Sequence, residues 1–418
     1  MKLKMNLKRY IYLLLLLPLL SLTSCFHNSS PKKFDPAQVK FNVSYNPYLD
    51  NRIYPSLILG LANYSGDHNK SELNLFSVEV TAPRDGAVLR IVLDSSYLNY
   101  VTIHQEIMPT KDIRYTFYPI IKWKYDNLYS TRQQGSVDLT FTCYIDDEEV
   151  DIKNLRLNYR SVNECLLSAR YSGHTVDFRW LFAGYVNEDH PNIDGILSEI
   201  LDQGIVNSFK GYQLGTEKSV TQQMQAIWYY ALNRGIAYSS ISCTSNPAAN
   251  ANVQHIRFFD EVYKNRQANC IDACVFFASI MRKIGLKPII FVEPCHAYLG
   301  YYTDRHRKKI ALLETTITGW VDFPALDRSV DTTTGLPSEE KYNTVKRFLT
   351  EKQQEKYAEG KMDLTQLKQT VADSLFRRAT TYNQEKYEIN KVHFIDTSDM
   401  SYQQLIIEDL RELVQPIN

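Results

Sequence analysis

A tightly bounded helix followed by short apolar strands constrains the middle of this chain more than any other feature. Asn269 is a favourable N-cap residue, and Asp272 stands three positions later, in the first turn. Gly285 suits the position just beyond a helix end, and Pro288 follows it. These start and stop signals agree on a helix over residues 270–284.

Three short segments rich in β-branched and aromatic residues follow this helix and predict strands, at residues 287–293, 296–302 and 310–315. The last two flank a polar stretch and predict a hairpin. If the hairpin turn centres near His306, Glu314 lies opposite either His296 or the residue two places further on. Both offsets are even, so the carboxylate and the imidazole are expected on one face of the sheet.

Cys270, His296 and Glu314 supply a thiol, a base and a carboxylate in that order. These are the parts of an activated cysteine nucleophile. A sulfur in the first turn of a helix meets unpaired N–H groups that favour the thiolate, and a carboxylate can orient the imidazole. Taken singly, such residues are more often ordinary core residues. The ordered set in this predicted geometry favours a catalytic site.

Four short motifs occur in order around these residues, namely Cys270-x-Asp272-Ala273, Arg282-x-x-Gly285-Leu286-x-Pro288, His296-Ala297-Tyr298 and Glu314-Thr315-Thr316. Together they resemble the core of the transglutaminase-like superfamily of cysteine enzymes, particularly its bacterial protease-like branch. The resemblance spans residues 193–320 and includes similar upstream elements at 233–238 and 253–262. It implies that Cys270 is the nucleophile, His296 the general base and acid, and Glu314 the third member.

The sequence departs from the usual pattern of that superfamily at two positions. Most members have Asp where Glu314 stands, and Trp where Tyr298 stands. A Glu can fill the same role if its backbone lies slightly further back. For the oxyanion, helix geometry makes the Cys270 backbone N–H one candidate donor, and the Gln254 side chain is a second candidate.

A zinc site is an alternative use of the cysteines and histidine in this segment, with the set Cys270, Cys274, Cys295 and His296. Cys295 and His296 are adjacent on a strand, so their side chains point to opposite faces and do not easily reach one metal. We therefore expect no metal and no cofactor, and no Asp-rich loop suggests calcium. The remaining cysteines show no framework spacing, although a disulfide among them stays open: Cys143, Cys165 and Cys243.

The N-terminus predicts the compartment. Residues 1–9 are basic and residues 11–20 are apolar, which is typical of a signal peptide over residues 1–24, too short for a membrane span. Leu22-Thr23-Ser24-Cys25 resembles a bacterial lipobox, so we expect cleavage before Cys25 and lipid attachment to its sulfur. The protein is then expected in the bacterial cell envelope, anchored to a membrane face outside the cytoplasm.

The charge balance argues against nucleic acid as a partner. The chain has 47 basic and 47 acidic side chains, and loss of residues 1–24 removes four basic ones, leaving 43 against 47 and a net charge of −4. The expected partners are a protein or peptide substrate, a cell-wall peptide included, and the membrane itself.

The fold class predicted from the whole pattern is α+β. Residues 25–35 read as a linker, and residues 36–162 alternate in short runs with turn signals at Asp85-Gly86 and Asp146-Asp147, which predicts an Ig-like β-sandwich. A papain/transglutaminase-like domain is expected over residues 163–330. A helical C-terminal region is expected over residues 331–418.

Within these regions the sequence indicates particular helices. Between residues 165 and 268 the chain reads as helical, most clearly at 193–201 and 221–234, and Trp228 is expected to pack on the sheet. The C-terminal region contains three amphipathic runs, at residues 338–358, 363–378 and 401–414. These runs would wrap the core or shape the cleft.

The predicted activity is acyl transfer at an amide, through Cys270, His296 and Glu314. Water as acceptor gives hydrolysis and an amine gives transamidation, and an envelope location favours hydrolysis of peptides or amides. One alternative is an inactive lipoprotein of the same fold that binds a protein or glycan. Another is cross-bridge chemistry on cell-wall amides.

Overall fold

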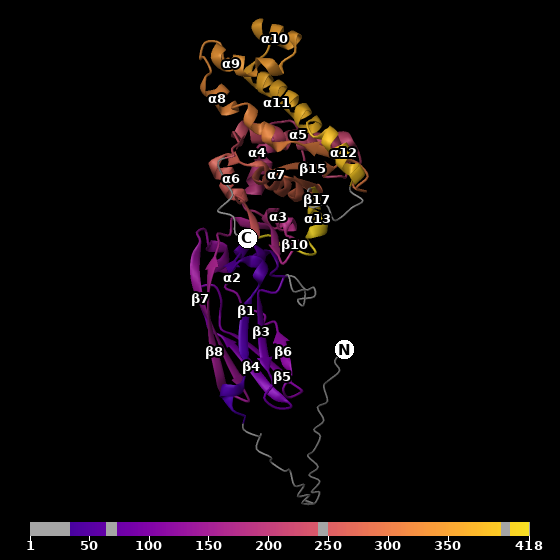
Figure 1. The fold of residues 1–418 in the computed structure, drawn as a ribbon. Coiled ribbons are helices and arrows are strands. Elements are labelled where there is room, and N and C mark those ends of the chain that lie inside the picture. Colours follow the sequence, from indigo (N-terminus) through magenta and orange to yellow (C-terminus); the bar gives the residue numbers. More distant parts are fainter. Residues whose placement is uncertain (1–33, 64–72, 241–249, 394–401, 418) are drawn as a thin grey trace, which may run out of the picture.

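The molecule is elongated, with strands filling one end and most helices gathered at the other end around a further sheet (Figure 1). The computed structural model describes residues 34–63, 73–240, 250–393 and 402–417. The mixture of helices with several sheets confirms the predicted α+β class. The expected signal peptide, Cys25 and Cys243 lie outside the described residues. Within the described ranges, none of the helices has the length and apolar composition that a membrane crossing needs.

Two sheets make up the N-terminal part. The first has the order β1-β3-β6, with β1 (Phe41–Tyr45), β3 (Phe76–Thr81) and β6 (Arg114–Phe117). The second has the order β2-β8-β7-β4-β5, with β2 (Arg52–Ile53), β8 (Glu148–Tyr159), β7 (Gly135–Ile145), β4 (Ala87–Leu93) and β5 (Thr102–Met108). The ring centroids of Phe76 and Phe141 lie 5.3 Å apart, so the sheets pack against each other. The predicted turn at Asp146 and Asp147 joins β7 to β8, and both residues have positive φ.

A third sheet follows in the chain, with the order β10-β9-β12. Its strands are β9 (Glu164–Tyr171), β10 (His174–Asp177) and β12 (Ala251–His255). The prediction of a helical segment over residues 165–268 is therefore wrong for these strands, because β9 pairs with a strand far along the chain that no local pattern identifies. Two predicted helices are confirmed, α4 (Asn192–Asp202) and α5 (Glu217–Arg234), the second of which ends at Gly235 with φ 77°.

The sheet that carries the predicted site residues has the order β16-β15-β14-β17. Its three predicted strands are β14 (Pro288–Glu293), β15 (His296–Tyr302) and β16 (Ile310–Leu313). The helix predicted before them is α7 (Cys270–Lys283), and it packs on β14 and β15. Leu299 pairs with Leu313, which centres the β15–β16 hairpin on His306 and confirms the expected register.

The C-terminal region is helical except where it joins this sheet. Its main helices are α8 (Phe323–Arg328), α9 (Glu339–Val345), α10 (Glu351–Ala358), α11 (Leu364–Thr381) and α12 (Gln384–His393). The helical prediction over residues 401–414 is wrong, because β17 (Gln403–Ile406) pairs antiparallel with β14 and only a short helix, α13 (Ile407–Leu410), follows it. Periodicity in so short an apolar run does not separate a strand from a helix.

Trp228 of α5 packs among helices. Its ring centroid lies 6.1 Å from those of Phe277 in α7 and Phe376 in α11. Its aromatic neighbours come from α7 and α11, and the expected packing of Trp228 on the sheet stays a prediction. The side chain thereby connects the helix that begins at Cys270 with the C-terminal region.

The last described residues return to the N-terminal part, and the C-terminus lies near the middle of the molecule (Figure 1). They contact two short helices, α1 (Pro55–Gly60) and α3 (Phe182–Tyr185). The Gln415 N–H donates to the Gly60 carbonyl at 3.0 Å. The Arg411 guanidinium donates to the Ala183 carbonyl at 2.7 Å. The C-terminal tail thus fastens the helix-rich part to the strands before it.

Candidate active site

Cys270 lies in the first turn of α7, as predicted. The Asn269 side chain accepts a hydrogen bond from the Asp272 N–H at 2.9 Å, and the Asp272 carboxylate accepts one from the Asn269 N–H at 2.9 Å. This reciprocal capping pair fixes where the helix begins. The partly exposed sulfur of Cys270 is therefore held at the positive end of the helix dipole.

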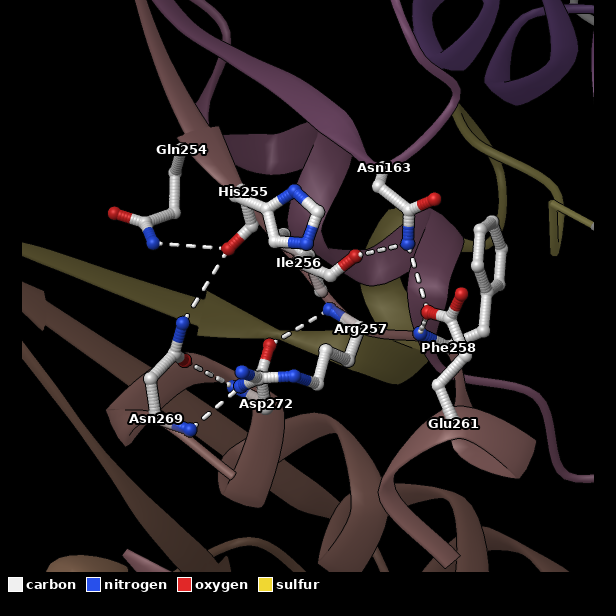
Figure 2. Close-up of polar contacts among 9 residues, drawn as sticks. All are labelled: Asn163, Gln254, His255, Ile256, Arg257, Phe258, Glu261, Asn269 and Asp272. Carbon is white, nitrogen blue, oxygen red and sulfur yellow. Dashed lines mark hydrogen bonds and ion pairs between the residues drawn. The ribbon is translucent and has the colours of Figure 1, made fainter. Parts of the chain in front are cut away.

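Asp272 also anchors the chain that leads into the site, as Figure 2 shows. Its carboxylate accepts hydrogen bonds from the Arg257 N–H at 2.8 Å and from the Arg257 guanidinium at 2.7 Å. The Asp272 side chain is fully buried. Burial raises the pKa of Asp272, while hydrogen bonds from Asn269 and Arg257 oppose that rise. One carboxylate thus joins the start of α7 to the strand end before it.

A second set of contacts in Figure 2 holds the same segment from the other side. The Asn163 side chain, next to β9, donates to the Ile256 carbonyl at 2.8 Å and to the Glu261 carboxylate at 2.8 Å. Glu261, in α6 (Phe259–Asn265), also accepts from the Phe258 N–H at 2.7 Å. Sequence reasoning missed this set, because no local signal connects Asn163 with residues so far along the chain.

Gln254 lies beside the N-terminus of α7. Its side-chain amide donates to the His255 carbonyl at 2.9 Å, and the Asn269 side chain donates to the same oxygen at 3.4 Å (Figure 2). A primary amide has two N–H groups, so this bond leaves one of them for another acceptor. The oxyanion role expected for Gln254 stays a prediction.

His296 and Glu314 form a direct hydrogen bond. His296 begins β15, Glu314 follows the last residue of β16, and His296 Nε2 lies 2.9 Å from Glu314 Oε2. The other carboxylate oxygen accepts from the backbone N–H of Thr316 at 3.1 Å and from its hydroxyl at 2.6 Å. Glu314 thereby caps the 3-10 helix η4 (Thr315–Trp320) and is held at both oxygens.

The protonation states follow from these contacts. Hydrogen bonds with Cys270 and with Glu314 raise the pKa of His296 to about 10. Burial tends to raise the pKa of Glu314, but hydrogen bonds from its neighbours, His296 first, outweigh burial and lower it. Imidazolium and carboxylate are therefore both charged at neutral pH. Since Nε2 bonds the carboxylate, Nδ1 is the ring nitrogen available to the sulfur.

The C-terminal region also reaches Glu314, which sequence reasoning did not predict. The Asn383 side chain, between α11 and α12, donates to Glu314 Oε2 at 2.7 Å. The Glu314 N–H donates to the Ala379 carbonyl at 2.8 Å. Neither residue lies in a recognisable motif, and each is far from Glu314 in the chain. Only the packing of α11 on β16 brings them together.

A cleft of about 240 Å³ opens at His296, lined also by Tyr238, Thr316, Gly319 and Trp320. Tyr238, in β11 (Ala237–Tyr238), and Trp320 are both partly exposed on its walls. A Cβ on Gly319 would come within 3.0 Å of the Tyr238 backbone, so glycine permits this close approach. Burial is the largest cause of a raised pKa at Tyr238, followed by the charges of Cys270 and Glu314. The Tyr238 hydroxyl is therefore close enough to both residues to feel their charge.

The remaining thiols are separate from this arrangement. Cys274 is buried and its sulfur lies 3.8 Å from the Thr315 hydroxyl, whereas Cys295 is exposed in the turn before β15. Over the described residues, no group of three or more His, Cys, Asp and Glu side chains is placed to hold a metal ion. The cysteines in those same ranges are free thiols.

No protein-family model matches this chain, and no curated protein matches it. The resemblance to transglutaminase-like enzymes therefore rests on short motifs. The contact between His296 and Glu314 and the effect of Cys270 on the pKa of the same imidazole are independent of that resemblance. They carry the functional argument that follows.

Proposed function

We propose that this protein is a cysteine enzyme that transfers the acyl group of an amide, on a papain/transglutaminase-like core preceded by an Ig-like β-sandwich. The observation that carries the proposal is the hydrogen bond of 2.9 Å between His296 Nε2 and Glu314 Oε2. Cys270 lies close enough to the same imidazole to be the largest cause of its raised pKa. A capped helix N-terminus under the sulfur and a cleft beside His296 support it.

The first half-reaction cleaves the amide. A protonated His296 beside the sulfur favours the thiolate of Cys270, which attacks the amide carbonyl carbon while the carbonyl electrons move to oxygen. The Cys270 backbone N–H and the Gln254 amide are the proposed donors to that oxygen. As the intermediate collapses, the carbon–nitrogen bond breaks and the imidazolium gives its proton to the departing amine. The acyl group remains on sulfur as a thioester.

The second half-reaction releases the acyl group. The neutral imidazole of His296 takes a proton from water or from a second amine as that molecule attacks the thioester. The thiolate of Cys270 leaves and the ion pair is restored. Water gives a carboxylic acid and an amine gives a new amide. We favour hydrolysis of peptides or cell-wall amides, because the N-terminal motif ending at Cys25 predicts an envelope lipoprotein.

The test is the rate of alkylation by iodoacetamide as a function of pH, followed at Cys270 by peptide mass spectrometry. We expect rapid labelling well below pH 8.5, near which a free thiol ionises. His296→Ala should move labelling of Cys270 up toward that ordinary range.

Cys295 provides an internal reference in the same experiment, because it is an exposed thiol in a turn. Its profile in the wild-type protein is the reference with which the profile of Cys270 is compared. If Cys270 labels like Cys295 and ignores the loss of His296, the catalytic proposal is wrong. A binding lipoprotein of the same fold would then be the better account.

A further inference from the structure

Asn383 is a buried polar side chain that nothing in the proposed chemistry yet uses. It is fully buried at the corner between α11 and α12. Its Nδ2 atom donates to Glu314 Oε2 at 2.7 Å, which is the same oxygen that meets His296 Nε2. The C-terminal region therefore contacts the one atom through which the carboxylate acts on the imidazole.

The orientation of the Asn383 amide is set by this contact. Its Oδ1 atom is buried and meets no hydrogen-bond donor among the described residues. An amide turned the other way would place two acceptor oxygens against each other, because an ionised carboxylate only accepts. A buried acceptor without a partner is unfavourable for folding. An apolar side chain would avoid this unpaired buried oxygen. We therefore attribute the presence of an amide here to the hydrogen bond that its N–H group donates to Glu314.

A backbone contact fixes the distance between the same two segments. The Glu314 N–H donates to the Ala379 carbonyl at 2.8 Å, one turn before Asn383. Leu375 and Phe376 of α11 are buried in the core beneath this contact. The corner that carries Asn383 is thus held against Glu314 at two points, one through the backbone and one through the side chain.

We propose that Asn383 is a positioning residue of the site, which holds Glu314 Oε2 in line with His296 Nε2. The inference rests on the proposed function, because the reactivity of Cys270 reports on the imidazole that Glu314 orients. It assigns to the C-terminal region a direct part in the site.

Two substitutions separate the donor from the volume of this side chain. Asn383→Leu keeps the size but removes the N–H group, and Asn383→Asp places a second carboxyl group against Glu314. A carboxylate that loses a donor, or gains a like charge, takes up a proton at higher pH. The acid limb of the Cys270 alkylation profile is the range over which labelling falls as the pH is lowered. It should therefore shift to higher pH by about one unit in Asn383→Leu, because one hydrogen bond to a charged group changes a pKa by about that much. It should move further in Asn383→Asp.

Gln384→Ala is the matched control, because Gln384 is the adjacent residue and its side-chain amide donates to the exposed Glu388 carboxylate, away from Glu314. It should leave the profile in place. In a Glu314→Gln background, Asn383→Leu should add no further shift, because the two residues act through one contact. Thermal unfolding of each variant accompanies the profiles. If Asn383→Leu does not fold, Asn383→Asp and the Gln384 control still decide the matter.

The outcomes distinguish the two proposals. An acid limb that stays in place in both Asn383 variants, while wild-type reactivity depends on His296, overturns the positioning role and leaves the enzyme standing. Additive shifts in the Glu314→Gln background also overturn it, because they assign Asn383 a general structural effect. A wild-type Cys270 that reacts as an ordinary thiol overturns both proposals.

Discussion

At the residue scale, the pair formed by His296 and Glu314 couples folding to pH. The pKa of His296 is raised to about 10, so its stabilising contribution is complete below about pH 6.5, its usual value, and is lost as the pH rises toward 10. The pKa of Glu314 is lowered, so its contribution is present above its usual value of about 4.3 and is lost as the pH falls through the folded value.

Glu314→Gln removes the charge from this pair while keeping the shape of the side chain. We expect a loss of about 2 kcal/mol in the free energy of unfolding near neutral pH, the typical size for a hydrogen bond to a charged group. We also expect a smaller fall in stability between pH 6.5 and 10. Urea denaturation across pH measures both, with the exposed Glu388→Gln as control. An equally steep fall in the Glu314 variant would show that Cys270, and not Glu314, accounts for the raised pKa of His296.

Local signals in the sequence predict the three central residues. The residues that hold those three in place could not be predicted from the sequence. Cys270 follows from an N-cap, and the contact of His296 with Glu314 follows from the register of one hairpin. Asn383 lies outside any motif, and the segment that contains Arg257 resembles the family without indicating which residue Arg257 contacts. Each contacts a residue that is not a sequence neighbour, so only the folded structure reveals these contacts.

At the scale of elements, the start of α7 depends on one buried ion pair. The Asp272 side chain is fully buried and the Arg257 side chain is 15% exposed, and the two form an ion pair. Asp272→Asn would leave the Arg257 charge without its counterion, and breaking a buried pair in this way costs about 3 kcal/mol. We expect that loss in chemical denaturation, together with slower labelling of Cys270.

Asp260→Asn is the control for this change, because Asp260 is an exposed carboxylate in the first turn of α6. Its effect should stay within about 0.5 kcal/mol, the usual range for surface positions. Equal stabilities for the Asp260 and Asp272 variants would mean that the ion pair does not hold the helix start.

The helices and strands, like the residues, were predictable only where local sequence signals define them. Helix α7 and the strands after it were predicted because caps, alternation and one hairpin are local signals. Strand β17 was read as helix because its four residues carry too little periodicity, and its pairing with β14 decides its conformation. Strands β9 and β12 were missed for a related reason, since each is stabilised by the other across a long intervening segment.

At the scale of the whole molecule, the N-terminal motif predicts attachment to a membrane. Cys25 closes the sequence Leu22-Thr23-Ser24-Cys25, and lipid on its sulfur would partition the protein into the bilayer. Wild-type protein expressed in a bacterium should sediment with membranes and be released by detergent. Cys25→Ser should shift it to the soluble fraction while Cys270 keeps its alkylation profile. Sedimentation of the variant with membranes would contradict lipid attachment at Cys25.

The position of β17 after the three site residues in the chain has a consequence for biosynthesis. A ribosome delivers Cys270, His296 and Glu314 before it delivers Asn383 and the strand that completes their sheet. At typical rates of synthesis the delay is on the order of ten seconds. A nascent chain therefore holds its thiol in an unfinished setting during that interval. If Cys270 is the nucleophile that we propose, the order of translation delays its complete setting until the residues of β17 have been made.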